Sequence, residues 1–148
     1  MLAKVALSFS SLALIGATST SLPESRNFTV PLTGQAESGP VQAAGLGGDM
    51  DASGLVKLEV DLAKRQICYD FALSDVATPL MAHIHKGPPQ QVGPSVVTLF
   101  TGPGVDLRDC TPWTEKWLTA IVADPANFYV NVSTTEYPDG ALRGQLLG

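Results

Sequence analysis

Two histidines separated by one residue are the part of this sequence best suited to chemistry. His83 and His85 are the only histidines in the 148-residue chain. They lie in an apolar stretch that predicts a strand, where residues two apart point to the same face, so both imidazoles should project beside Met81. Imidazole binds copper and zinc, but a tight site needs a third or fourth ligand. The pair predicts either such a metal site, completed by Met81 or a neighbouring carboxylate, or two structural histidines in a polar face.

The last two predicted strands carry a second set of polar side chains. If these strands pair as a hairpin, the polar groups on one face lie side by side. Arginine offers a planar fork to a carboxylate or to backbone carbonyls. We expect Arg143 to pair with Glu136 or Asp139 in an internal network, and a pocket for a small ligand is the alternative. The network is predicted to comprise Asn131, Ser133, Arg143 and Gln145.

Alternation of apolar and polar residues predicts the elements that position these groups. It indicates an all-β protein, an antiparallel sandwich or barrel of Greek-key type with about seven strands and one short helix. Pro31 suggests that the first strand lies at an edge, and residues 34–54, rich in small residues, predict a loop. The strands are expected over 28–32, 56–62, 67–73, 80–85, 95–100, 128–134 and 141–147, and the helix over 114–123.

The N-terminus has the pattern of a secretory signal peptide. Lys4 precedes an apolar run over residues 5–15, and Ala17 and Ser19 fit a cleavage site of small residues. The apolar run is shorter than the roughly 20 residues of a membrane span, and no other long apolar stretch follows. We therefore expect a signal peptide over 1–19, a single domain over 20–148, no membrane span, and a secreted or periplasmic location.

Charge and composition exclude several partners and reactions. Cleavage after Ser19 leaves 129 residues with 8 basic and 14 acidic side chains, without a basic cluster. Phosphate and anionic membranes need concentrated positive charge, so nucleic acid is not an expected partner. No convincing Ser–His–Asp or Cys–His set and no phosphate-binding glycine loop is found. The sequence therefore predicts a protein that is not an enzyme.

Cys68 and Cys110 are the only cysteines. An even pair in an exported chain favours a disulfide. The alternatives are a metal-thiolate pair and a redox pair, and the wide separation, without C-x-x-C spacing, argues against both. We predict a structural bridge.

Three motifs follow one another in the second half of the chain: Ala82–Gly87, Tyr129–Thr134 and the segment 138–145, which ends Arg-Gly-Gln. In this order they resemble the CHRD domain, first named from chordin and common in secreted bacterial proteins. The resemblance implies a β-rich extracellular module without established catalytic activity, and Cys68 and Cys110 are similar to a family disulfide. Ser133 stands where members commonly have a histidine, which reduces any ligand set built from the family's histidines.

Together these observations predict an exported, disulfide-linked β-sandwich that acts as a non-catalytic binding or structural module. Its ligand, whether a protein, a glycan or a metal, is not named by the sequence. The alternative is a copper- or zinc-binding protein that uses His83 and His85.

Overall fold

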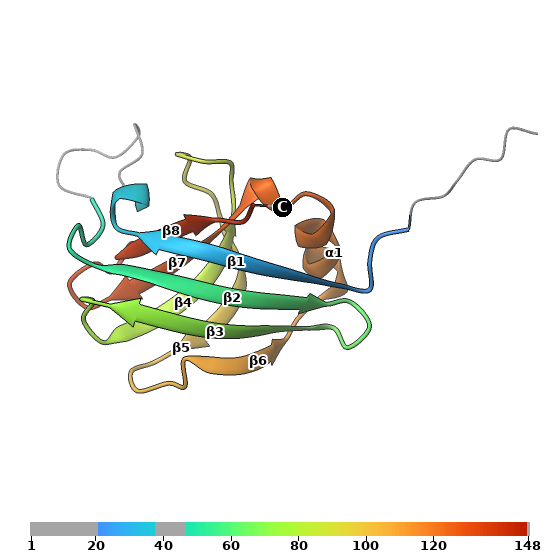
Figure 1. The fold of residues 1–148 in the computed structure, drawn as a ribbon, viewed down its shortest axis with the longest axis horizontal. Coiled ribbons are helices and arrows are strands. Elements are labelled where there is room, and N and C mark those ends of the chain that lie inside the picture. Colours follow the sequence, from blue (N-terminus) through green and yellow to red (C-terminus); the bar gives the residue numbers. More distant parts are fainter. Residues whose placement is uncertain (1–20, 38–46, 148) are drawn as a thin grey trace, which may run out of the picture.

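Eight antiparallel strands in two stacked layers make up most of the computed structural model, which describes residues 21–37 and 47–147 (Figure 1). One α-helix, α1 (Glu115–Ala123), and two short 3₁₀ helices, η1 (Gln35–Glu37) and η2 (Pro125–Asn127), complete the described elements. The strands are β1 (Ser25–Thr33), β2 (Ser53–Asp61), β3 (Gln66–Ser74), β4 (Pro79–Lys86), β5 (Ser95–Thr101), β6 (Arg108–Pro112), β7 (Phe128–Thr134) and β8 (Leu142–Gln145).

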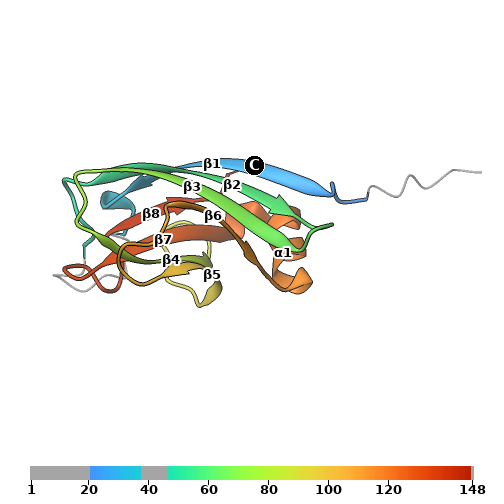
Figure 2. The same ribbon diagram turned by 90° about the horizontal axis from the view of Figure 1, so that it is seen from below.

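The strand order β5-β4-β7-β8-β1-β2-β3-β6 divides into two four-stranded halves. They are joined between β8 and β1 by a single pair, Thr33 with Arg143. Figure 2 shows the halves as two layers, with β1, β2 and β3 in one and β4, β5 and β7 in the other. The expected all-β antiparallel sandwich is confirmed, with eight strands in place of about seven.

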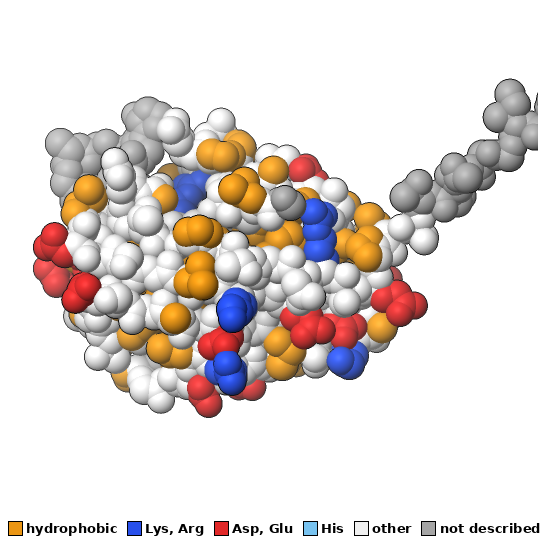
Figure 3. Space-filling view, in the orientation of Figure 1, with side chains coloured by type: hydrophobic (Ala, Val, Ile, Leu, Met, Phe, Trp, Pro, Cys, Tyr) orange, Lys and Arg blue, Asp and Glu red, His pale blue; other side chains and the backbone are white. Residues whose placement is uncertain are grey.

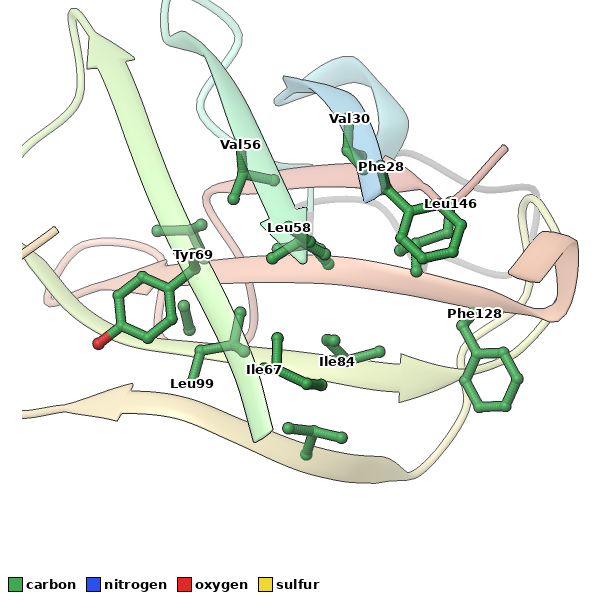
Figure 4. Packing of buried hydrophobic residues seen from close by; sticks show 14 of the residues in the cluster. Phe28, Val30, Val56, Leu58, Ile67, Tyr69, Ile84, Leu99, Phe128 and Leu146 are labelled. Atoms are coloured by element: carbon green, nitrogen blue, oxygen red, sulfur yellow. The ribbon is translucent and has the colours of Figure 1, made fainter. Parts of the chain in front are cut away.

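The hydrophobic core lies between the two layers. Along β1, β2 and β3 buried residues alternate with exposed or partly buried ones, as a sheet with one solvated face requires. Figure 4 shows Val56, Leu58 and Ile67 of one layer directed at Ile84 and Leu99 of the other. Each fully buried side chain of this size contributes about 1.5–3 kcal/mol.

Helix α1 lies at one end of the sandwich (Figure 2). Its stripe of Leu118, Ile121 and Val122 is buried, and Arg26 of β1 donates a hydrogen bond to the Val122 carbonyl at 2.7 Å. The predicted helix is thus present, although Thr114 occupies the N-cap position without a side-chain capping bond. Neither α1 nor any other helix in the described ranges is long and apolar enough to cross a membrane.

Two expectations about the strands differ from the structure. Strand β6 was not predicted, because Arg-Asp-Cys-Thr-Pro has no apolar alternation; it forms by pairing with β3 along five residues. The edge position inferred from Pro31 is wrong, since β1 lies between β2 and β8. Proline is tolerated there because the β1–β8 ladder is confined to Thr33. Of the predicted loop over 34–54, η1 and the start of β2 are ordered elements.

The predicted signal peptide over 1–19 lies outside the described residues. The predicted bridge between Cys68 and Cys110 is confirmed. It joins two directly opposed residues of β3 and β6, so it fastens the outermost strand of its layer to the rest of the sheet.

The join between the two layers depends on Gly144. A Cβ atom there would lie 2.2 Å from the Pro31 carbonyl oxygen and 2.7 Å from a methyl carbon of Val30. A backbone oxygen cannot swing aside as a flexible side chain can, so only glycine lets β8 approach β1 this closely.

We expect Gly144→Ala to lower the unfolding free energy by about 2–3 kcal/mol because it overpacks this join. Urea titration measures the change. Gly54→Ala is the matched strand control, since its Cβ would first meet the mobile end of Leu73. Equal losses in the two variants would contradict the special role of Gly144.

We expect Cys68→Ala/Cys110→Ala to lower the unfolding free energy by about 3–4 kcal/mol, because the bridge closes a loop between residues 42 apart. Urea titration of the variant and of the reduced wild-type protein should agree. Alkylation of the native protein should detect no free thiol. Two reactive thiols, or unchanged stability, would contradict a structural bridge.

Candidate functional site

The outer face of β4, β7 and β8 carries polar side chains that are largely withdrawn from solvent. Strand β7 is buried at all seven positions, so both of its faces are covered. The register aligns His83 with Asn131 and Asn131 with Arg143 in one row. The next row is His85, Tyr129 and Gln145. We call these six residues, with Ser133 and Glu37, the polar layer.

His85 is fixed by two neighbours within the polar layer. Its Nδ1 lies 2.9 Å from the Gly93 carbonyl oxygen, and because a carbonyl only accepts, Nδ1 carries the proton. The ring stacks on Tyr129 with centroids 5.0 Å apart. Nε2 is therefore an unprotonated acceptor, and it is buried without a hydrogen-bond partner among the described residues.

Arg143 also contacts Tyr129. Its guanidinium carbon lies 3.4 Å from the centre of the Tyr129 ring, in the cation–π range. The same guanidinium donates to the Pro88 carbonyl at 3.1 Å and lies 3.5 Å from Oε1 of Gln145.

These contacts hold the β4–β5 loop, residues 87–94, against the sheet. Gln145 donates to the carbonyls of Gly87 at 2.9 Å and Ala126 at 2.6 Å. The Gly93 amide donates to the Tyr129 hydroxyl at 3.2 Å. Side chains of three strands thus bind backbone groups of the loop at Gly87, Pro88 and Gly93, and Gln145 also ties η2 to the same sheet through Ala126.

Glu37 of η1 enters the polar layer from a different part of the chain. Asn131 donates to its carboxylate at 2.7 Å and to the Asp139 carbonyl at 3.3 Å. Ser133 in turn donates to the Asn131 side-chain oxygen at 3.3 Å. Glu37, Asn131 and Ser133 are all buried, so these hydrogen bonds replace those that water would make.

Gly140 makes room for the contact between Glu37 and Asn131. Its φ is +148°, a conformation that favours glycine. A Cβ atom there would lie 2.4 Å from the Asn131 amide nitrogen and 2.7 Å from the Glu37 carboxyl. The glycine of the predicted turn is therefore required by the polar layer as well as by the turn.

Burial dominates the electrostatics of the layer. Desolvation raises the pKa of Glu37 to about 7, against the opposing effects of Arg143 and of the Asn131 hydrogen bond. Desolvation also lowers the pKa of Arg143 and of both histidines; His85 acts further against His83, and Arg143 against His85. Glu37, Arg143 and the two histidines are thus each pushed toward the neutral form, as expected away from water.

The sequence-derived residues are distributed as follows. The structure brings together, in the polar layer, His83, His85, Asn131, Ser133, Arg143 and Gln145. Arg143 does not form the expected ion pair with Glu136 or Asp139; Asp139 contributes only its carbonyl, which accepts from Asn131. The carboxylate whose field acts on Arg143 is that of Glu37. Glu37 was missed because its glycine- and alanine-rich surroundings have no strand or helix period.

The metal role of the histidines stays a prediction. Their ring centroids are 5.9 Å apart and their planes nearly perpendicular, at 88°. Over residues 21–37 and 47–147, no group of three or more His, Cys, Asp or Glu side chains is placed to hold a metal ion. Met81 is opposite Ser133 in the register. Among the residues that the structure describes, the two imidazoles therefore lack a third His, Cys, Asp or Glu side chain placed to share a metal ion with them, and Glu37 of the same polar layer is not so placed.

Comparison with protein families finds a match to the CHRD domain. The model of the CHRD domain matches residues 28–146, which include every strand except the first residues of β1. Comparisons with curated proteins and with solved structures find no match.

We expect Glu37 to make the protein less stable as pH rises. The folded pKa of about 7 exceeds the ordinary 4.5, so the folded state binds the proton more tightly than the unfolded state between these values. The unfolding free energy contributed by Glu37 is therefore highest below pH 4.5, falls through pH 7 and then levels off, by about 3 kcal/mol in all.

Glu37→Gln removes this titration while it keeps an amide that can hydrogen-bond to Asn131. We expect the stability difference, variant minus wild type, to grow more positive between pH 5 and pH 8, as urea titrations at both values would measure. Exposed Glu136→Gln is the matched control and should follow the wild type. A parallel pH profile for Glu37→Gln would show that Glu37 does not titrate in this range.

Proposed function

Because the chain belongs to the CHRD domain family, we propose that it is an exported, non-catalytic binding module that presents its β4–β5 loop to a partner. CHRD is in general a non-catalytic domain family. The observation that carries the proposal is that the polar layer holds the β4–β5 loop in place. The side chains that could do chemistry, His85, Arg143 and Gln145, are bonded to backbone carbonyls of the loop.

The loop has the properties of a preorganised recognition element. Its ends are held at Gly87 and Gly93, whereas Pro89, Gln90, Gln91 and Val92 at its tip are exposed. Val92 is 71% exposed, although it is apolar, and Gln90 takes a positive φ of 65°. A segment already held in one conformation loses less entropy on binding, which favours affinity.

Export is supported by two independent features. Disulfides persist mainly in oxidising compartments, and Cys68 and Cys110 are bridged. Residues 1–19 have the charge and hydrophobicity pattern of a signal peptide. Both features support a secreted or periplasmic location, where a protein or glycan partner would meet the loop.

We expect Arg143→Ala to loosen the β4–β5 loop, because the Pro88 carbonyl loses its donor and Tyr129 loses the guanidinium. Hydrogen exchange should become at least about tenfold faster at the Gly87 and Gly93 amides. The amides of the β2–β3 turn, residues 62–65, serve as the internal control. Unchanged exchange at the loop would remove the argument for preorganisation.

Partner binding through the loop can be tested by photo-crosslinking in the cells that produce the protein. A crosslinking amino acid at Val92 should give a defined adduct, and Arg143→Ala should weaken it. The same amino acid at exposed Lys64, in the β2–β3 turn, is the control. Identical adducts from both positions, or none from Val92, would contradict recognition through the loop.

A second candidate is copper or zinc binding by His83 and His85. The observation that favours it is the state of His85: Nδ1 donates to a backbone carbonyl, as ligating histidines commonly do, and leaves Nε2 as a free acceptor. Against it stands the small ligand set, because Ser133 occupies the place of the family's usual histidine and donates to Asn131.

Metal binding is tested by loading the purified protein with copper or zinc, desalting it and measuring metal content. Near-stoichiometric metal that is absent from His83→Ala/His85→Ala would establish the site. If wild type and variant retain the same amount, the histidines are not ligands. Circular dichroism of the variant shows whether it remains folded.

A further inference from the structure

A second surface feature lies on the other layer, on the outer face of β1, β2, β3 and β6. It is a hollow of about 410 Å³ between two rows of side chains that cross all four strands. The residues between the rows, Phe28, Leu58 and Tyr69, direct their side chains into the core. On β1, β2 and β3 only backbone therefore separates the rows, whereas on β6 the exposed Asp109 lies between them. We call this feature the cross-strand groove.

The first wall of the groove is the row Asn27, Glu59, Cys68 and Cys110, which are consecutive partners in the strand register. Asn27, Glu59 and Cys110 are exposed, and Cys68 is half-buried. The disulfide within this wall fastens its outer end. It also gives the wall an apolar portion beside an amide and a carboxylate.

The second wall is the row Thr29, Lys57, Asp70 and Arg108, again consecutive register partners. Arg108 forms an ion pair with Asp70, and the hydrogen bond from Arg108 lowers the pKa of Asp70. Lys57 and Thr29 are exposed beside them. Long lysine and arginine side chains add apolar stems to the wall.

The dimensions suit one unbranched chain lying across the strands. Rows two residues apart on a strand are separated by about 7 Å, and four strands span about 14 Å. Because the groove is built on paired strands and a disulfide, its shape is fixed before anything binds.

The chemistry of the walls selects among possible chains. With Asp109, the charged residues that line the groove are two basic and three acidic side chains, Lys57, Arg108, Glu59, Asp70 and Asp109. This mixture attracts neither a polyanion nor a polycation. In Figure 3, which views this layer, acidic and basic side chains are interspersed over it. A peptide normally gains affinity from main-chain pairing at a sheet edge, whereas the backbone groups of β1, β2 and β3 that face this groove already belong to ladders. A ligand chain that contacts only the side chains of the groove, without main-chain pairing, is therefore favoured.

We propose that the cross-strand groove binds a neutral polysaccharide. Sugar hydroxyl groups both donate and accept, so they match walls that contain an amide, a hydroxyl, carboxylates and cations. The C–H faces of the sugar rings match the disulfide and the side-chain stems. The proposal deepens the proposed function, since it gives the binding module a ligand class, but it uses the layer opposite the β4–β5 loop.

The test uses the purified protein and soluble mixed-linkage β-glucan, xyloglucan and dextran, with heparin and polygalacturonate as anionic comparators. Affinity electrophoresis identifies a ligand and titration calorimetry measures it. We expect binding to at least one neutral polymer, weakened about tenfold or more by Asn27→Ala/Glu59→Ala. Ser53→Ala/Glu136→Ala changes two exposed polar residues outside the groove and should bind as the wild type does.

Three results would overturn the proposal. They are the absence of binding to every neutral polymer, a preference for the anionic polymers, and neutral binding that the groove variant leaves unchanged. Thermal unfolding of both variants shows that a loss is not a loss of fold. Failure here leaves the crosslinking result at Val92 unaffected, so the groove and the loop are judged separately.

Discussion

A strand buried on both faces constrains the whole molecule. One side of strand β7 packs its apolar residues against the core. On the other side its residues Tyr129, Asn131 and Ser133 are buried as well. Polar groups removed from water must find partners within the protein, or they cost stability. The partners come from η1, from the β4–β5 loop and from β8. The positions of these segments follow from that requirement.

Burial also explains the shifted pKa values of Glu37 and Arg143 in the polar layer. Arg143 is stabilised by the Tyr129 ring and by the Pro88 carbonyl, and it forms no ion pair with a carboxylate of the described residues. Glu37 lies near enough for the two charges to interact. These interactions do not offset the loss of hydration of either group. Burial therefore raises the pKa of Glu37 and lowers the pKa of Arg143. A buried carboxyl that titrates near pH 7 makes the fold sensitive to the pH of its surroundings.

The two layers present unlike outer faces. The side chains on the face of β4, β7 and β8 make contacts within the protein, and they hold the exposed β4–β5 loop in place. The face of β1, β2, β3 and β6 is solvated, and a disulfide holds its outermost strand, β6, to β3. This division fits a module whose polar layer is structural and whose two proposed recognition surfaces are the β4–β5 loop on one layer of the sandwich and the cross-strand groove on the other.

The sequence by itself determined the strands whose apolar residues alternate, the helix before Asp124, the bridge between the two cysteines and the face shared by His83 and His85, because these depend on local periodicity and on composition. Only the tertiary structure decided the rest. Strand β6 exists through its pairing with β3, β1 tolerates Pro31 because β8 pairs with it at one residue, and Glu37 meets Asn131 from 94 residues away. Such contacts join residues whose local sequence carries no sign of one another, so the buried partner of a polar group appears only when the chain is folded.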